Sequence, residues 1–443
     1  MDHLNEEGTL RTIRGRLVGA AALCCVIATY LVVSAAPAAA EDESLKPHDN
    51  ITIRSDEQFD AAHGVVAGSG TPKDPYVISG WKVHHIHIAD TAAAVVIENN
   101  DIPGQLILNW NGPYIRVADN KIGDLRVNQN VKRTGAATGG LIADNSFGRV
   151  GQLRHFDGVF EHNIVKPPRG LFDPIFGPVD AVNFDGFNGA VFRENTLYGP
   201  LKVKLHGHHH GSDFGESSHQ HSHGAHSMDA PETDHTKRYH EVFVQNNTIH
   251  SSGPYALRWT DSAHRGDDRT AASEENEALN KPHQHWTKVR LTGNRLVGSG
   301  LYVDIFNADD QNHTATGHGS VEILDNIITL QRADTEAFDS RHGIQVWNAK
   351  DLDLRIARNQ IVSEIEENAA TELWQRTTGI LLEDLDVANA YIAKNQVTNS
   401  YYGVRASYFT ETVNWWVTGL ATDQVTEDVY YDQSVSNPPR REP

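Results

Sequence analysis

Histidines crowd one short stretch of the chain. Ten of the chain's 25 histidines fall between residues 206 and 240, and two groups there have the spacing His-x-His-x-His. Residues two apart share one face of an extended segment, so their imidazoles can converge on one ion. Neutral imidazole is a good ligand for Zn²⁺ and Cu²⁺. The predicted metal ligands are the six histidines of these two groups: His206, His208, His210, His219, His221 and His223.

Three interpretations of this stretch stay open. A geometrically fixed site needs a few histidines that are oriented by hydrogen bonds from neighbouring groups. A low-specificity scavenging loop needs only many histidines on a tether rich in Gly and Ser, which residues 207–226 resemble. In the third interpretation the stretch is a solvated insertion that binds metal incidentally. Carboxylates such as Asp213 and Glu216 add oxygen ligands, so Ca²⁺ is a further alternative.

Basic, acidic and aromatic residues recur on short strands that open after Gly or Pro. Alternation along the strand that begins at Leu201 sends Lys202 and Lys204 outward. Later strands, aligned at their opening residue, predict one outward column that contains Lys204, Arg258, Asp304, Trp347 and Glu383. Cations stacked about 4.8 Å apart could bind an acidic sugar and let a base abstract the proton beside its carboxylate, as in a polysaccharide lyase.

This column predicts a carbohydrate site. The candidate catalytic residues are Lys204, Arg258 and Asp304, and the candidate sugar-binding residues are Lys202, Trp259, Tyr302, Trp347 and Glu383. Asp304 and Glu383 could instead form the carboxylate pair of a glycoside hydrolase. The plainest alternative is a solvent-facing sheet that pairs opposite charges for solubility.

The element that must position these residues is a short strand that repeats along the chain. Each unit alternates apolar and polar residues, is rich in β-branched residues and ends at an asparagine. The asparagines are at positions 100, 120, 145, 163, 195, 247, 294, 326, 359 and 395, and the shortest spacings are 18 and 20 residues. This is about one coil of a three-sided solenoid. We therefore predict an all-β, right-handed parallel β-helix of about ten coils with long loop insertions.

The recurring asparagine is predicted to be structural. Asparagine tolerates the left-handed backbone conformation of a tight turn, and asparagines in register can form a ladder up the stack. The chain has 443 residues and a formal net charge of −20, from 38 Lys and Arg against 58 Asp and Glu. Sequence-independent binding to nucleic acid is disfavoured, because it needs clustered cations.

The N-terminus predicts export. Three arginines precede an apolar run over residues 17–36, and small residues at 38–40 form a cleavage site before Glu41. We therefore predict a signal peptide over residues 1–40 and a secreted, periplasmic or cell-surface protein with no membrane span in the mature chain. An uncleaved anchor is the alternative, because the run is about long enough to cross a bilayer. Both cysteines, Cys24 and Cys25, lie in this run, so a metal would be held by nitrogen and oxygen.

A phrase before the first repeat bears on the family. Gly68-Ser69-Gly70-Thr71 is followed by Asp74-Pro75-Tyr76-Val77-Ile78 and by Gly80-Trp81. With the Asn-marked coils, this phrase resembles secreted parallel β-helix repeat proteins of the pectin-lyase-like fold, including the NosD-like periplasmic group. The resemblance implies a ligand site on the outer face of one sheet. It does not imply one activity, since the fold carries lyases, hydrolases, epimerases, adhesins and metal-handling proteins. The chain lacks the calcium-binding aspartate cluster and arginine motif typical of pectate lyase.

We expect an N-terminal segment over residues 41–90, the β-helix over 91–412, and over 413–443 an aromatic cap that has lost the repeat. Two insertions, 206–240 and 262–285, interrupt the β-helix, and residues 271–279 could form a short helix. The leading functional interpretation is a monomeric secreted protein that binds divalent transition metal. The second is a β-helix that binds or cleaves acidic polysaccharides. A surface adhesin is the third, and no sorting signal supports it.

Overall fold

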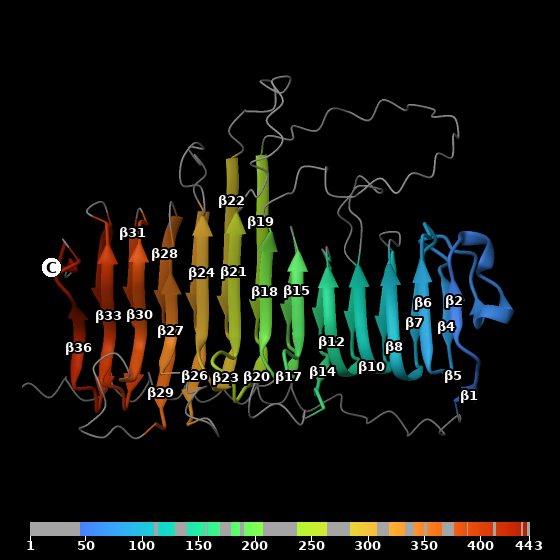
Figure 1. The fold of residues 1–443 in the computed structure, drawn as a ribbon, viewed down its shortest axis with the longest axis horizontal. Helices are drawn as coiled ribbons and strands as arrows, with labels where there is room; N and C mark the ends of the chain where they lie inside the picture. The colour runs from blue at the N-terminus through green and yellow to red at the C-terminus, as the bar shows by residue number, and fades with distance from the viewer. Residues whose placement is uncertain are drawn as a thin grey trace, which may run out of the picture. The chain divides into compact units, whose positions relative to one another are not determined.

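A stack of parallel strands makes up the described part of the chain. The computed structural model describes residues 45–109, 114–128, 140–154, 156, 158–168, 179–186, 190–206, 237–263, 284–307, 319–332, 341–349, 352–365, 376–387, 389–410, 413–435 and 437–440. In the compact unit Lys46–Pro443, successive strands lie side by side along the stack (Figure 1). No helix among the described residues is long and apolar enough to span a bilayer. The predicted signal peptide lies outside the described residues.

Each coil has three sides. Among the described residues, the first side is a 13-stranded sheet, parallel throughout except for the antiparallel pair β3–β4. Its strands are β3 (Val65–Ala67), β4 (Tyr76–Ser79), β7 (Val95–Glu98), β9 (Ile115–Ala118), β11 (Leu141–Ala143), β13 (Val159–Glu161), β16 (Ala190–Arg193), β19 (Lys237–Gln245), β22 (Gln284–Thr292), β25 (Gly319–Leu324), β28 (Leu352–Ala357), β31 (Asn389–Ala393) and β34 (Asn414–Thr418). Two short 3-10 helices, η1 (Asp56–Gln58) and η2 (Ala61–His63), precede β3.

The second and third sides belong to one 23-stranded sheet. The second side contains β1 (Lys46–Pro47), β5 (Trp81–Lys82), β14 (Ile164–Val165), β17 (Thr196–Tyr198), β20 (Thr248–His250), β23 (Arg295–Gly298), β26 (Ile327–Leu330), β29 (Gln360–Ser363), β32 (Gln396–Thr398) and β35 (Ala421–Asp423). The third side contains β2 (Ile51–Ile53), β6 (His85–Ala89), β15 (Val182–Gly186), β18 (Leu201–His206), β21 (Leu257–Ala263), β24 (Leu301–Asn307), β27 (His342–Trp347), β30 (Thr378–Leu385), β33 (Tyr402–Phe409) and β36 (Glu427–Tyr431). Three longer strands, β8 (Asp101–Asn109), β10 (Lys121–Asn128) and β12 (Ser146–Arg154), run along both sides.

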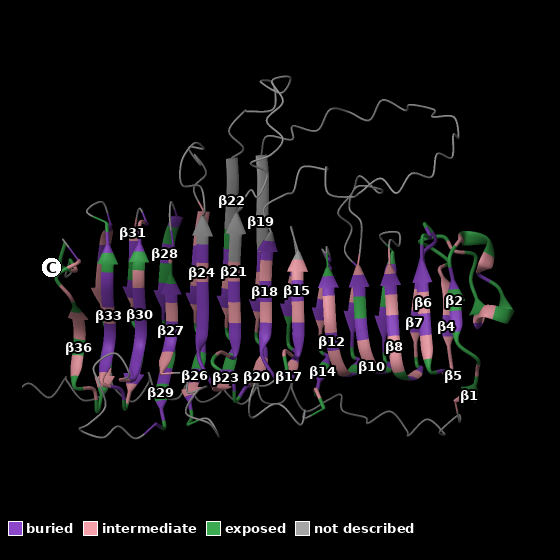
Figure 2. Cartoon of the chain, viewed as in Figure 1, coloured by how far each residue is buried: buried purple, intermediate pink, exposed green. Residues whose placement is uncertain are grey.

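Buried and more exposed positions alternate along the strands (Figure 2), and the buried positions carry mostly apolar side chains. In β18, Leu201, Val203 and Leu205 are fully buried, whereas Lys202 and Lys204 are half-buried on the outer face. The same inward pattern continues from Ile51 to Trp415 as one cluster of buried residues. The protein is thus an all-β parallel β-helix, and the predicted fold class is confirmed.

The ten asparagines form a continuous hydrogen-bonded ladder inside the turn between the first and second sides. Asn163, for example, donates its backbone N–H to Asn195 Oδ1 at 2.9 Å and its Nδ2 to the carbonyl of Ile142 at 2.9 Å. The ladder runs from the N–H of Trp81, which donates to Asn100 Oδ1 at 3.0 Å, to Asn395, whose Oδ1 accepts from Asn359 N–H at 3.0 Å. The predicted structural role of the asparagines is confirmed.

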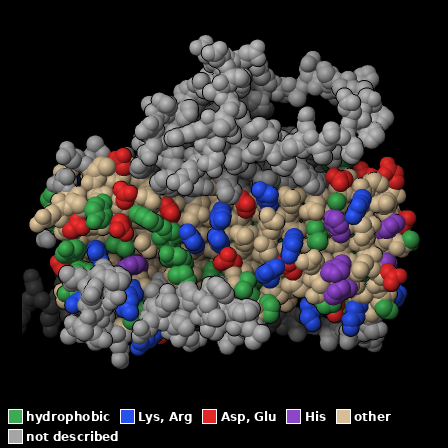
Figure 3. Space-filling view, viewed as in Figure 1, with side chains coloured by type: hydrophobic (Ala, Val, Ile, Leu, Met, Phe, Trp, Pro, Cys, Tyr) green, Lys and Arg blue, Asp and Glu red, His purple; other side chains and the backbone are tan. Residues whose placement is uncertain are grey.

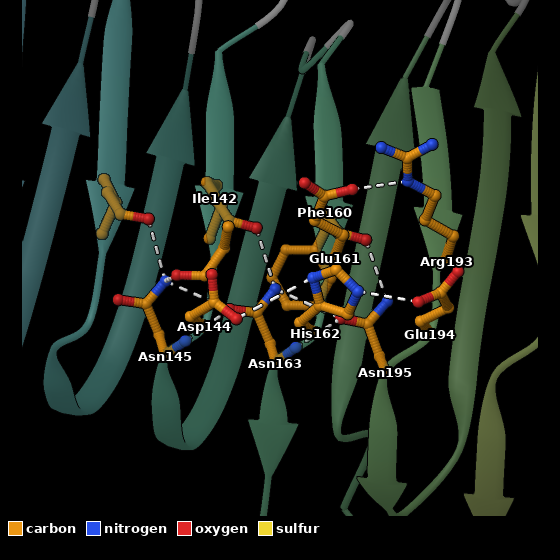
Figure 4. Close-up of polar contacts among 12 residues, drawn as sticks. Ile142, Asp144, Asn145, Phe160, Glu161, His162, Asn163, Arg193, Glu194 and Asn195 are labelled. Atoms are coloured by element: carbon orange, nitrogen blue, oxygen red, sulfur yellow. Dashed lines mark hydrogen bonds and ion pairs between the residues drawn. The ribbon is translucent and has the colours of Figure 1, made fainter. Parts of the chain in front are cut away.

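The left-handed residue of each turn is the one before the asparagine. Asp144, His162 and Glu194 have φ values of 58°, 54° and 58°, and a glycine takes this position once, at Gly293. The prediction that the asparagine itself adopts this conformation is wrong, because its amide must point inward to reach the next coil. Figure 4 shows Asn145, Asn163 and Asn195 joined in the ladder, with the row of left-handed residues beside them. In that row His162 Nε2 lies 2.7 Å from Glu194 Oε2.

Strand pairing extends past both ends of the predicted repeat. At the N-terminal end of the described residues, β1 pairs with β5 and β2 pairs with β6, so the described stack already includes Lys46. At the C-terminus, β34, β35 and β36 pair in parallel with β31, β32 and β33. The aromatic segment therefore continues the coil, contrary to the expectation that it has lost the repeat. The repeat is hidden because Trp415 occupies the inward position of Ala390 and Leu420 stands where the next ladder asparagine would be.

Candidate functional site on the third side

The predicted metal ligands fall where the structure gives no side-chain positions. His208, His210, His219, His221 and His223 lie outside the described residues, and only the backbone of His206 is described, as the end of β18. Most of the insertion 262–285, including the predicted helix, also lies outside them. Among the described residues, no three His, Cys, Asp or Glu side chains gather as metal ligands. Metal binding through the histidine-rich stretch therefore stays a prediction.

Two columns of outward residues run along the third side. We call the first the arginine column: Asn183, Lys202, Arg258, Tyr302, Gln345, Leu381 and Arg405. We call the second the tryptophan column: Asp185, Lys204, Thr260, Asp304, Trp347, Glu383 and Ser407. Members of a column are about 4.8 Å apart along the stack. The two columns are two residues apart along each strand, so they form one surface.

The single column predicted from the sequence is wrong at Arg258. Arg258 pairs with Lys202, whereas Lys204 pairs with Thr260. The sequence alignment started this strand at Tyr255, but Leu257 is the residue that pairs with Leu201. A shift of the strand pairing by two residues keeps each side chain on the same face of the sheet and changes only its neighbours on the adjacent strands.

Trp259 does not belong to the outer surface. Its side chain is fully buried in the interior of the coil, between the inward positions of Val203 and Val303 on the neighbouring strands. A sugar on the outer face cannot contact it, so its assignment as a sugar-binding residue is wrong. Alternation from Arg258 already places Trp259 inward.

Arg258 lies over two tyrosine rings. Its Cζ is 5.8 Å from the ring centre of Tyr255 and 5.5 Å from that of Tyr302, and the two rings are 4.6 Å apart. Such distances allow cation–π attraction, which fixes the guanidinium plane. The Nε of Arg258 is buried and has no hydrogen-bond partner among the described residues. A guanidinium held by rings rather than by a carboxylate keeps its donors for an anionic ligand.

Lys202 and Lys204 extend this positive charge toward β15. Lys202 Nζ lies 3.9 Å from Asp180 Oδ2, at the start of the neighbouring coil. Partial burial raises the pKa of Asp180 above its ordinary value, although the charges of Lys202, Arg258 and Lys204 act in the opposite direction. Three cations thus act on the carboxyl group of Asp180, and burial makes its ionisation less favourable.

Asp304 lies beside the tyrosines, on the far side of Arg258 from the lysines. Its carboxylate accepts hydrogen bonds from Tyr302 Oη at 3.3 Å and Asn348 Nδ2 at 3.4 Å. Burial raises the pKa of Asp304, against the effect of these bonds and of Arg258. The pKa of Tyr302 is also raised, first by burial and then by the charge of Asp304. Tyr302 therefore stays protonated at neutral pH and serves as a donor.

Trp347 and Glu383 continue the tryptophan column beyond Asp304. Trp347 is 39% exposed, and its ring centre is 6.4 Å from that of Tyr302. Burial raises the pKa of Glu383, and Arg405 on the next strand opposes that rise. Figure 3 shows this face of the molecule, with Lys and Arg gathered over the middle strands and histidines over the N-terminal strands.

The structure thus brings Lys202, Lys204, Arg258 and Asp304 together on one surface. Tyr302 belongs to the arginine column but is only 4% exposed, so it supports Arg258 rather than offering a ring to a sugar. Sequence reasoning missed Tyr255 and Asp180, which lie just before their strands. The spacing of Tyr255, three residues before Arg258, is the signal that points to it. Comparisons with protein-family models, with curated proteins and with solved structures find no match to this chain.

Proposed function

We propose that the protein binds an acidic polysaccharide along the outer face of the third side. The observation that carries this proposal is Arg258, which lies over Tyr255 and Tyr302 with a buried, unpartnered Nε among the described residues. Lys202, its neighbour in the arginine column, adds a second cation. Carboxylated sugars offer both an anion for the cations and apolar ring faces for the aromatic side chains.

The sequence supports the same proposal in two further ways. The N-terminal pattern of arginines, apolar run and small residues favours export, and polysaccharides are ligands that an exported protein meets. The Gly-Ser-Gly-Thr and Asp-Pro-Tyr phrases resemble the pectin-lyase-like group of parallel β-helices. We therefore place the protein in that group as part of the proposal.

If the bound polysaccharide is cleaved, the chemistry rests on Lys204, Arg258 and Asp304. Arg258 would neutralise the sugar carboxylate and so acidify the adjacent C–H, and Lys204, as the neutral amine, would take that proton. The glycosidic C–O bond on the next carbon would then break to form the C=C bond, and the leaving oxygen would take a proton from water. Asp304 would hold Tyr302 in place through their hydrogen bond. A β-elimination of this kind leaves an unsaturated sugar that absorbs in the ultraviolet, which gives a direct assay for turnover.

The test is a binding panel with the mature chain. Polygalacturonate, alginate, hyaluronan and dextran sulfate are titrated against wild-type protein and Arg258→Lys. Lysine keeps the charge but loses the planar fork that stacks on the rings, so we expect affinity to fall about tenfold. Arg295→Gln, on the exposed second side, is the control and should bind as wild type. Absence of wild-type binding to all four polymers would overturn the proposal.

A second candidate function is binding of Zn²⁺ or Cu²⁺ by the histidine-rich stretch, and the ten histidines between residues 206 and 240 favour it. Calorimetric titration of residues 41–443 with each metal at pH 7 and pH 5 tests this candidate. Saturable binding at pH 7 that is lost at pH 5 is expected, because imidazoles protonate near a pKa of about 6.5. Deletion of residues 207–235 should abolish this binding and leave polysaccharide binding intact. Binding without defined stoichiometry would contradict a specific metal site.

A further inference from the structure

The third side carries the arrangement around Arg258 a second time. Tyr402 precedes Arg405 by three residues, just as Tyr255 precedes Arg258. The strand pairings place Arg405 in the same column as Arg258, four strands further along the stack. The two Tyr-x-x-Arg phrases therefore occupy equivalent positions on one face, although the strands between them do not contain the phrase.

The two arginines share a contact with the tyrosine three residues earlier, although Tyr402 is fully buried and Tyr255 is half-buried. Arg405 Cζ lies 5.6 Å from the ring centre of Tyr402, against 5.8 Å between Arg258 and Tyr255. In both arginines the Nε is buried and has no hydrogen-bond partner among the described residues. Each guanidinium thus lies over an aromatic ring and has an Nε donor that no described protein group uses.

Two further arginines, Arg376 and Arg341, lie near the Arg405 region. Arg376 lies with its Cζ 3.8 Å from the ring centre of Tyr401, the residue before Tyr402. Burial, and then the charges of Arg405 and Arg341, lower the pKa of His342 to about 4. Glu383 is the opposing carboxylate, and burial raises its pKa. The charges of Asp384 and Asp432 also raise the pKa of Glu383, and that of Glu427 raises the pKa of Tyr402, so Arg405 has acidic as well as basic neighbours.

The surface between the two arginines suits an extended ligand. Four strand spacings of about 4.8 Å place the arginines ~19 Å apart along the stack. Trp347 lies on the strand midway between them, two strands from each, and is 39% exposed. An exposed indole there offers a flat apolar surface to a sugar ring while the arginines hold charged groups at either end.

We infer that Arg405 and Tyr402 form a second anion-binding subsite, equivalent to that of Arg258 and Tyr255, and that one linear acidic glycan spans both across Trp347. This inference rests on the proposed function and extends it, because it sets the minimum length of the preferred ligand. A short acidic oligosaccharide fills each subsite separately. A chain longer than ~19 Å joins them and gains affinity from the linkage of two binding events.

The experiment is calorimetric titration with oligomers of two lengths, prepared from polygalacturonate and from alginate. The short ligand is the disaccharide, and the long ligand is a chain of about ten rings, which exceeds the ~19 Å between the arginines. Wild-type protein should bind two disaccharides but one long chain. Arg405→Gln should bind one disaccharide and lose about 100-fold in affinity for the long chain, because the two sites no longer act together. Arg258→Gln should do the same, and Arg295→Gln should match wild type.

The outcomes separate the inference from the proposed function. A wild-type stoichiometry of one disaccharide, with long-chain affinity unchanged by Arg405→Gln, would overturn the second subsite and leave the proposed function standing. Failure of the wild type to bind any acidic polymer would overturn the proposed function itself. Circular dichroism and thermal melts of each variant show that a loss of binding does not arise from unfolding, and Arg405→Lys, which keeps the charge, gives a second test at the same position.

Discussion

Replacement of one ladder asparagine by alanine should destabilise the protein strongly. Asn294 is fully buried, and its Oδ1 accepts hydrogen bonds from the backbone N–H of Asn247 at 3.0 Å and from its Nδ2 at 3.1 Å. Its own Nδ2 donates to the carbonyl of Val244 at 2.9 Å and to Asn326 Oδ1 at 3.0 Å. Asn294→Ala removes all four of these side-chain bonds.

The expected loss follows from the groups left without a partner. The N–H of Asn247 loses its ladder acceptor, and the carbonyl of Val244 loses a donor. The amide of Asn247 still reaches the carbonyls of Phe192 and Gln245, and Asn326 Oδ1 still accepts the backbone N–H at position 294. Two buried groups at about 1–3 kcal/mol each give a predicted loss of about 2–6 kcal/mol in the free energy of unfolding.

Urea unfolding of the mature chain, followed by circular dichroism, measures this loss as a shift of the midpoint at constant slope. Asn389→Ala is the matched control, because the side chain of Asn389 donates to Asp353 Oδ1 at 2.9 Å on the exposed surface. The control should lose no more than about 0.5 kcal/mol. Equal losses for the two variants would refute the argument that the buried ladder stabilises the coils.

Three further outcomes are expected. Trp259→Ala should cost about 3–5 kcal/mol in urea unfolding, because the ring is buried, while the folded protein keeps its glycan affinity; a loss of affinity at unchanged stability would contradict its place in the core. Binding of dextran sulfate, which stays ionised, should strengthen as the pH falls from 7 toward the raised pKa of Asp304, because protonation removes a negative charge near Arg258. Asp304→Asn should flatten this dependence of affinity on pH. The same pH profile in wild type and Asp304→Asn would contradict the role given to Asp304. Hydrogen bonds from Arg358 lower the pKa of Asp325. The contribution of this ion pair to the free energy of unfolding should therefore be present above the unfolded pKa of Asp325 and be lost as the pH falls through its lower folded pKa. In thermal melts, the melting temperatures of wild type and Asp325→Asn should converge at low pH.

The coil and its ladder could be predicted from the sequence because the strands show alternating apolar and polar residues and the ladder shows a recurring asparagine. The asparagines could be placed because an apolar residue that points inward in the next strand follows each of them two positions later. The left-handed position could not, since it holds residues as different as His162, Glu194, Arg358 and Lys394, all of which can point into solvent there. The backbone at that position needs a left-handed conformation, and many residue types can adopt it, so the residue type alone does not identify the position.

The site was predicted in its composition but not in its register. The inward and outward positions followed from alternation, which a shift of two residues does not change. The partner of Arg258 depended on where β21 begins, and a sequence with loops of varying length does not reveal that residue. The equivalence of Arg258 and Arg405 was hidden for the same reason, because it appears only when the strands between them are paired.

The asparagine ladder stops one coil short of each end of the stack. Its first donor is the N–H of Trp81, and its last acceptor is Asn395 Oδ1, so β1 and β2 at one end and β34 to β36 at the other lie outside it. A molecule pulled by its ends would therefore lose the coil at each end first. These end coils are held by strand pairing, packing and isolated side-chain hydrogen bonds such as that from the N–H of His85 to Asn50 Oδ1 at 3.0 Å. The coils between Trp81 and Asn395 would then resist together, because each side-chain amide there fastens its own turn to its neighbours.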